Sequence, residues 1–232
     1  MNAFDTISLS TKKFGMVEVK PRIEIVLSSV DYYNKNKGYG ELLCLVENED
    51  GIIPPHEFFH EIEDFEVVSL YRRVIALINQ RVDLNVGVIS LNTPLSIIND
   101  AGTIALLKSS KQRFALEIME EEVCKLSFCE CGVLNDSKGS LEIWLDDFGQ
   151  KSSNFDFISG GRVSLDKVKI SKEVFWYAFD KNKSFLIELI RLFKGCDLGV
   201  VVEGVETNEH FSFLSNLGCL MQGFYFNSLW SE

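Results

Sequence analysis

The chain has 232 residues and a formal net charge of −11, and 46% of its residues are hydrophobic. This size and composition predict one globular domain, residues 1–232, with a sizeable core. So acidic a chain lacks the clustered lysines and arginines of a nucleic-acid-binding surface, and no direct contact with nucleic acid is expected. No apolar run approaches the ~20 residues of a membrane span, and the start shows no signal peptide. A cytoplasmic protein without membrane contact is therefore expected.

Short apolar runs alternate with stretches of helical periodicity from residue 14 onward. The predicted strands cover residues 14–21, 41–46, 86–91, 114–118, 141–145, 168–170, 200–203 and 222–226. The first strand is expected to end at Pro21, and residues 31–40 are expected to form a loop. Long helices are expected over residues 56–80 and 174–193, with shorter helices in between and one ending near residue 217.

Repeated strand–helix–strand units predict a parallel sheet. About eight strands in a chain of this length favour a closed (β/α)8 barrel over an open sheet. No linker, charge block or low-complexity segment divides the sequence. The predicted fold class is therefore α/β, as a single barrel.

Six cysteines are scattered along the chain, as is typical of reduced thiols in a cytosolic protein. Cys124, Cys129 and Cys131 lie close together, but zinc requires a fourth ligand and more regular pairs. The three histidines are distant from this cluster in sequence. A zinc site is therefore not favoured there.

Polar and acidic side chains stand at or near the ends of the predicted strands. They are Glu41, Asn92, Glu117, Asp146, Asp147, Lys169 and Glu203. In a barrel the carboxyl ends of the strands converge on one site. Carboxylate and amide oxygens without matching thiols predict Mg²⁺ or Mn²⁺, and an aspartate pair can bridge two such ions on a phosphodiester. Lys169 would then stabilise charge, and Glu203 would act as a general base.

Each of these residues also has a structural interpretation. Glu117 and Glu120 could be acids of a first helical turn, and Asp146 could be a helix cap. Glu203 and Glu206 could be solvated acids of a surface turn. Because polar residues recur at nearly every strand end, a shared site is favoured over coincidence.

The motifs around these residues resemble those of the EAL-domain family, bacterial proteins of cyclic di-GMP signalling. The matching segments are LEIME at 116–120, LDDFG at 145–149, VKI at 168–170, VEGVET at 202–207 and QG at 222–223. Weaker matches are ISLN at 89–92 and ELL at 41–43, where the family has E-A-L. The resemblance covers roughly residues 14–230.

The resemblance implies a modified TIM barrel with an antiparallel first strand, which hydrolyses cyclic di-GMP to the linear dinucleotide with two Mg²⁺ or Mn²⁺ ions. It assigns Glu41, Asn92, Glu117 and Asp146 to the first ion. It assigns Asp146, Asp147 and Glu203 to the second, and Lys169 to the water. Gln222 would bind substrate, and Glu120 and Glu206 would support the loop after Asp147.

The position of the E-A-L glutamate has two alternatives. An ungapped alignment places Gly40 there, whereas a loop shorter by one residue places Glu41 there. A slip of one residue turns a strand side chain to the opposite face, so the choice decides whether the first ion has all its ligands. We prefer Glu41.

Several expected substrate contacts are replaced. Leu45 stands where the family has a phosphate-binding arginine, and Lys20 stands where it has a glutamine beside the guanine. The loop after Asp147 is one residue shorter, and Ser171 replaces an aspartate. These changes predict weak or absent binding of cyclic di-GMP and a metal ion that is weakly held or absent.

Three functions remain compatible with these features. The favoured one is a regulatory protein with little or no hydrolysis that acts by contact with another protein, for example the flagellar master transcription activator. The alternatives are a Mg²⁺- or Mn²⁺-dependent cyclic di-GMP phosphodiesterase and a cyclic di-GMP receptor without turnover. Function depends on the site rather than on the fold, so the position of Glu41 bears on this choice.

Overall fold

The computed structural model describes residues 4–34, 38–81, 84, 86–150 and 161–226. Its strands are β1 (Ile7–Thr11), β2 (Gly15–Ser28), β3 (Tyr39–Asn48), β4 (Gly51–Ile53), β5 (Val88–Asn92), β6 (Arg113–Met119), β7 (Leu141–Phe148), β8 (Lys167–Ile170), β9 (Gly199–Val202) and β10 (Leu220–Gln222). Its helices are α1 (Ser29–Asn34), α2 (Pro55–Glu61), α3 (Asp64–Gln80), α4 (Leu95–Ile98), α5 (Ala101–Ser109), α6 (Glu120–Val123), α7 (Phe128–Asn135), α9 (Lys172–Lys181), α10 (Lys183–Gly195) and α11 (Asn208–Leu214).

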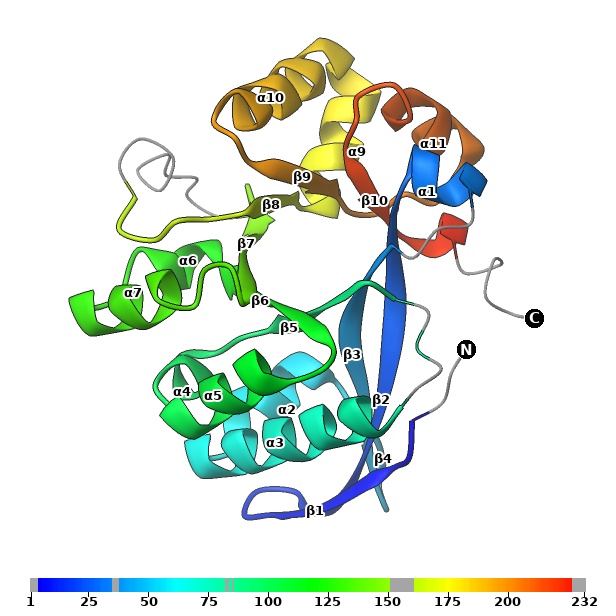
Figure 1. The fold of residues 1–232 in the computed structure, drawn as a ribbon. Coiled ribbons are helices and arrows are strands. Elements are labelled where there is room, and N and C mark those ends of the chain that lie inside the picture. Colours follow the sequence, from blue (N-terminus) through cyan, green and yellow to red (C-terminus); the bar gives the residue numbers. More distant parts are fainter. Residues whose placement is uncertain (1–3, 35–37, 82–83, 85, 151–160, 227–232) are drawn as a thin grey trace.

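Eight of the strands close into a barrel in the order β2-β10-β9-β8-β7-β6-β5-β3, and pairing of β2 with β3 completes the ring. β2 is antiparallel to both of its barrel neighbours, β10 and β3. The remaining barrel pairs are parallel, as between β5 and β6. The predicted barrel with an antiparallel first strand is therefore confirmed. Helices lie around its outside, with α2 to α5 on one side and α9 to α11 on another (Figure 1).

Two further strands extend the sheet beyond the barrel and were not predicted. β1 pairs with the first residues of β2, and β4 pairs with the end of β3. The prediction that the first strand ends at Pro21 was also wrong, because β2 runs through this residue to Ser28. β1 covers residues 15–19 of β2 and β10 covers residues 26–28. Pro21 thus lies where one edge of β2 has no strand partner, and there a proline is tolerated.

Local capping explains three other differences from the predicted elements. The segment at 31–40 begins in helix α1, where the Asp31 backbone N–H donates to Ser28 Oγ at 3.0 Å. The helix predicted at 56–80 is divided, because Glu63 starts α3 with a capping box that includes Glu66. The helix predicted at 174–193 is divided at Asn182, whose side chain accepts a hydrogen bond from Phe185 N.

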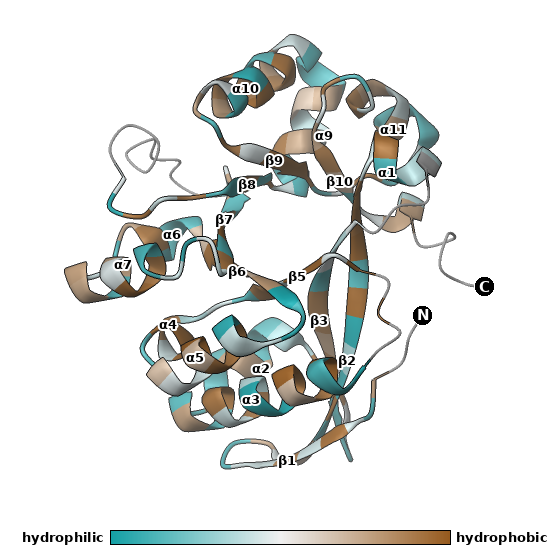
Figure 2. Cartoon of the chain, in the orientation of Figure 1, coloured by the Kyte–Doolittle hydropathy of each residue, from teal (hydrophilic) through white to brown (hydrophobic). Residues whose placement is uncertain are grey.

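The core has two parts. The larger part packs the helices against the outside of the barrel. The smaller part fills the barrel interior with side chains from five strands: Val26, Val88, Ala115, Trp144 and Val201. In Figure 2, β9 and β10 are coloured as hydrophobic, whereas β8 is coloured as hydrophilic. The hydrophilic strand is the one that carries Lys169.

All six cysteines lie in described residues and are free thiols. Within the described part of the chain, no helix combines the length and apolar character that crossing a bilayer requires.

Candidate active site

The alternation of strand side chains places the predicted site residues directly above the apolar interior of the barrel. Glu41, Glu117, Asp146 and Glu203 each lie two positions after a residue of the interior core, namely Tyr39, Ala115, Trp144 and Val201. Since residues two apart on a strand share a face, both members of each pair point inward. The polar set therefore forms a layer at the C-terminal ends of the strands, where barrel proteins carry their sites.

Lys169 stands at the centre of this layer, with only 1% of its surface exposed. Its Nζ lies 3.1 Å from Glu41 Oε2, 3.0 Å from Glu117 Oε2, 2.9 Å from Asp146 Oδ1 and 2.9 Å from Glu203 Oε1. We call Glu41, Glu117, Asp146 and Glu203, together with Lys169, the carboxylate cluster. Four acids thus surround one ammonium group, which leaves a surplus of negative charge if all four are ionised.

Glu41, rather than Gly40, carries its side chain into this cluster. Glu41 is 5% exposed and accepts hydrogen bonds from Asn92 Nδ2 at 2.9 Å and Gln222 Nε2 at 2.7 Å. A Cβ atom on Gly40 would instead lie 2.4 Å from the side chain of Ile23. Asn92 and Gln222 therefore lie beside the cluster and orient its glutamate.

Asp147 shares the site with Asp146 although the two are adjacent in sequence. Neighbouring side chains of a regular strand point to opposite faces. The register of β7 with β8 shifts between Leu145 and Phe148, and Asp147 has a φ of 57°. This left-handed conformation is one that aspartate tolerates better than most residues. Besides burial and the charge of Asp146, the charges of Lys169 and Glu41 act on the pKa of Asp147, which places its side chain near the cluster.

The turn that carries Glu203 is held by two close approaches of glycine. Gly204 has a φ of 72°, and its carbonyl accepts a hydrogen bond from Trp176 Nε1 at 2.8 Å. A Cβ on Gly223 would lie 2.5 Å from the backbone of Val205. Val205 N donates to Gln222 O at 2.9 Å, which joins the turn to the end of β10. The last strand consequently ends at Gln222, and the prediction of a strand at 222–226 was wrong after its first residue.

Burial and mutual repulsion control the charges of the cluster. Burial alone would lower the pKa of Lys169, but the charges of the surrounding acids outweigh it and raise this pKa well above its ordinary value. Burial, together with the charge of Glu41, raises the pKa of Glu117 well above its ordinary value. Burial also raises the pKa of Glu203 to about 7 and that of Asp147 to about 6. Lys169 therefore remains an ammonium ion, while some of the acids resist ionisation.

The chemistry of this donor set suits a divalent cation. Its groups are oxygens, which Mg²⁺ and Mn²⁺ prefer, and its acids outnumber its one lysine. Glu117 Oε1 is buried and has no hydrogen-bond partner among the described residues. Across the described ranges, however, no three Asp, Glu, His or Cys side chains form a ready-made metal centre. The carboxylates point at Lys169 instead, so a cation would have to share them with its ammonium group.

The two predicted loop-supporting acids lie in different environments. Glu120 is buried, and its Oε2 accepts a hydrogen bond from Gly149 N at 3.1 Å, just after the aspartate pair. Glu206 is exposed, and its backbone N–H donates to His210 Nδ1 at 3.3 Å. The loop that it was expected to support continues into residues 151–160, outside the described residues.

Three residues around the cluster were not predicted from the sequence: Glu24, Tyr71 and Arg22. Glu24 pairs with Glu41 across β2 and β3, and burial together with the charge of Glu41 raises the pKa of Glu24. The Tyr71 hydroxyl donates to the backbone oxygen of Asn92 and so fixes the end of β5. Arg22 lies two residues before Glu24 on β2 and shares its face. A strand prediction that continued beyond Pro21 would have placed both β2 residues beside the site.

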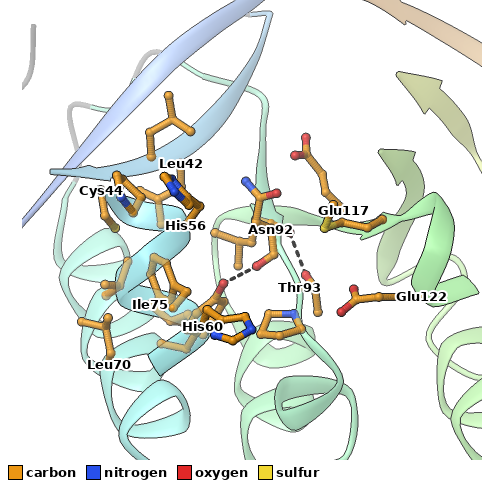
Figure 3. Close-up of a pocket in the computed structure, with 18 of the residues that line it drawn as sticks. Leu42, Cys44, His56, His60, Leu70, Ile75, Asn92, Thr93, Glu117 and Glu122 are labelled. Carbon is orange, nitrogen blue, oxygen red and sulfur yellow. Dashed lines mark hydrogen bonds between the residues drawn. The ribbon is translucent and has the colours of Figure 1, made fainter. Parts of the chain in front are cut away.

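A cavity of about 600 Å³ adjoins the carboxylate cluster. Asn92 and Glu117 line this cavity. Glu117 is a member of the cluster, and Asn92 contacts the cluster through its hydrogen bond to Glu41. In Figure 3, Leu42, Cys44 and His56 stand on one side of Asn92, and Glu117 and Glu122 stand on the other. The cavity is therefore a space beside the acids that a ligand could occupy.

Fold and site together define a (β/α)-barrel protein with a carboxylate-rich centre at the C-terminal ends of its strands. Residues 29–228 match the EAL domain, and the chain belongs to this family. Cyclic di-GMP phosphodiesterase PdeH of Escherichia coli K12 is 27% identical over 197 residues, which is 76% of this chain and 71% of PdeH. Probable cyclic di-GMP phosphodiesterase PdeA of the same strain is 27% identical over 223 residues, which is 87% of this chain but 30% of PdeA.

Solved structures share this fold. The YkuI protein of Bacillus subtilis, with an EAL domain and in complex with substrate cyclic di-GMP and calcium, has a TM-score of 0.71 and 21% identity. The match covers 89% of this chain and 54% of YkuI. The chain thus spans about half of YkuI, and the likeness concerns the barrel.

Proposed function

We propose that the chain is a divalent-metal-dependent phosphodiesterase that hydrolyses cyclic di-GMP to the linear dinucleotide. The observation that carries this proposal is the surplus of buried carboxylates around Lys169. Several acids in one buried site repel one another, and a divalent cation relieves that repulsion. The names of PdeH and PdeA and the substrate complex of YkuI agree with this substrate. The inward side chain of Glu41 supports this alternative over the regulatory function that the sequence favours.

The ligands of the metal would be Glu41, Asn92, Glu117, Asp146 and Asp147. A bound Mg²⁺ or Mn²⁺ would polarise the phosphoryl group and lower the pKa of a water molecule. Lys169, as a buried ammonium ion, would hold the acids together and stabilise charge that develops on the phosphate. Glu203, with a pKa of about 7, can accept a proton near neutral pH and suits a general base.

Substrate affinity is expected to be low. Leu45 offers no charge to a phosphate, and it lies opposite Lys20 on β2. Lys20 is engaged by Glu47 and lies 3.8 Å from Glu18. One lost contact between an arginine and a phosphate weakens binding by about 10- to 100-fold.

The test is hydrolysis of cyclic di-GMP by the purified chain with Mn²⁺, followed by separation of the linear product. Product should form with Mn²⁺, should cease with EDTA, and should fall at least about 100-fold in Asp146→Asn. Asp180→Asn removes an exposed acid and serves as the matched control, with unchanged activity expected. Binding of cyclic di-GMP without product would favour a receptor instead.

A second candidate is the regulatory protein that acts by contact with another protein. It is supported by Phe185 and Leu192, which are 50% and 47% exposed on α10. These residues are seven apart, so they lie on the same side of the helix. If this function operates, Phe185→Ser with Leu192→Ser should abolish the effect on motility, whereas Asp146→Asn should retain it. The reverse pattern would reject this candidate.

A further inference from the structure

The cavity beside the carboxylate cluster opens where two barrel strands part. β3 pairs with β5 only from Tyr39 to Leu42. Beyond Leu42 the edge of β3 leaves β5, and the cavity lies there between β3, α2, α3 and the end of β5. Much of its lining is apolar: Leu42, Leu70, Val74, Ile75 and Leu91. An apolar cavity of about 600 Å³ with a few polar groups is of the size and kind that holds a planar organic ligand.

Arg22 reaches this cavity from the antiparallel strand β2. It pairs with Leu43, two pairs along the ladder from Glu24 and Glu41. Directly paired residues of antiparallel strands point to the same face, and so do residues two apart on a strand. Arg22 therefore shares a face with Glu41 and lies two pairs, about 7 Å along the strand, closer to the open end of the barrel.

The state of Arg22 differs from that of the other cation on this face. Lys20 is paired with Glu47 and has Glu18 nearby. Arg22 is exposed, and its charge acts on Glu24, but among the described residues its guanidinium forms no ion pair within 4.0 Å. Of the cavity-lining residues that the structure describes, Arg22 is the one lysine or arginine. Its charge is therefore available to a ligand, at a point where the cavity meets the carboxylate cluster.

We propose that Arg22 binds a phosphate group of a nucleotide phosphodiester whose base lies against the apolar lining of this cavity. A guanidinium group matches two phosphate oxygens, which a lysine or histidine cannot do in the same way. The ligand would extend from the cavity past Asn92 and Glu117 to the cation held by the carboxylate cluster. This assignment rests on the proposed function, because it takes cyclic di-GMP as the ligand. In this proposal, Arg22 is a main determinant of the affinity for cyclic di-GMP.

The experiment measures binding of cyclic di-GMP in the presence of Ca²⁺ by calorimetry, for the whole chain and three variants. Arg22→Gln keeps most of the side-chain length and removes the charge, and it should weaken binding by about 10- to 100-fold. Arg22→Lys should recover part of the loss, because the charge returns without the planar fork. Arg113→Gln is the matched control, because Arg113 begins β6 at the opposite end from the site, is exposed and does not line the cavity, so its dissociation constant should stay within about twofold of wild type.

Added salt separates a phosphate contact from a packing effect. Raising the ionic strength from 0.05 to 0.5 M should weaken wild type more than Arg22→Gln, and the melting temperatures of the two should agree. Equal affinity of Arg22→Gln and wild type would overturn the role of Arg22 and leave the phosphodiesterase proposal standing. Equal losses in Arg22→Gln and Arg113→Gln would have the same meaning. No binding by wild type would overturn the proposed function and this assignment together.

Discussion

Replacing Lys169 with methionine should strongly destabilise the metal-free protein. Methionine has a similar length but no charge, so the four acids within 3.1 Å of Nζ would lose their shared counter-ion. Removing one partner from a buried ion pair costs about 3–5 kcal/mol, because the other charge remains buried. Protonation of the acids limits this loss at low pH, as their carboxyl groups become neutral. The loss should therefore be largest above neutral pH.

Urea unfolding in EDTA at pH 8 and pH 5.5 measures both effects. Lys167→Met is the matched control, because Lys167 lies two residues earlier on β8 and is also largely buried. It contacts Glu142 and the rings of Tyr39 and Trp144, so about 1–3 kcal/mol should be lost. Mn²⁺ should narrow the difference in stability between Lys169→Met and wild type, whereas it should leave the difference between Lys167→Met and wild type unchanged.

Two results would refute this reasoning. Equal stability of Lys169→Met and wild type at pH 8 would mean that the acids are not held by the lysine. An equal loss at both pH values would mean that the effect comes from packing, since a charge effect must weaken as the carboxyl groups take up protons.

The remaining predictions concern pH and backbone geometry. In the folded protein the pKa of Glu203 is about 7, raised from 4.5. As pH rises, this carboxyl group therefore ionises in the unfolded chain before it ionises in the folded protein. The metal-free protein should consequently lose stability between about pH 4.5 and about pH 7. The loss from this group is at most about 3 kcal/mol. Glu203→Gln should reduce the change of melting temperature with pH in EDTA, and an unchanged pH dependence would contradict the raised pKa of Glu203. Gly223→Ala should cost about 1–3 kcal/mol, because its φ is 147° and its Cβ would meet the backbone of Val205. Gly132→Ala is the control, because Gly132 lies within helix α7 and an added Cβ would meet no atom within 4 Å. This variant should be neutral or more stable by up to about 1 kcal/mol in the same urea assay. Similar losses of stability in the two variants would reject this argument.

The barrel and most of its polar layer could be predicted because both depend on local patterns. Runs such as residues 199–202 are apolar throughout, as a strand covered on both faces must be. The period of two then places Glu117 above Ala115 and Asp146 above Trp144. These relations need no knowledge of which strands are neighbours.

Features that depend on pairing between distant segments could not be predicted. The choice between Gly40 and Glu41 required the register of β2 and β3, which is set by contacts across the barrel. The roles of Glu24 and Arg22 were hidden because β2 was expected to end at Pro21. The strand can continue through this proline because neither β1 nor β10 pairs with it. Which residues of β2 these two strands pair with is set by the folded barrel and cannot be read from the local sequence.

The charge balance of the polar layer bears on its purpose. An ion pair that served only to join β8 to its neighbours would need one acid for Lys169, as Glu142 serves Lys167. The cluster instead places Glu41, Glu117, Asp146 and Glu203 against one ammonium group. Burial raises the pKa values of Glu117 and Glu203, and the charges of neighbouring acids raise them further, so each additional buried acid opposes ionisation of the site. Such a surplus destabilises the barrel without a cation and stabilises it with one, so the same acids that disfavour the empty fold are the reason to expect a divalent ion there.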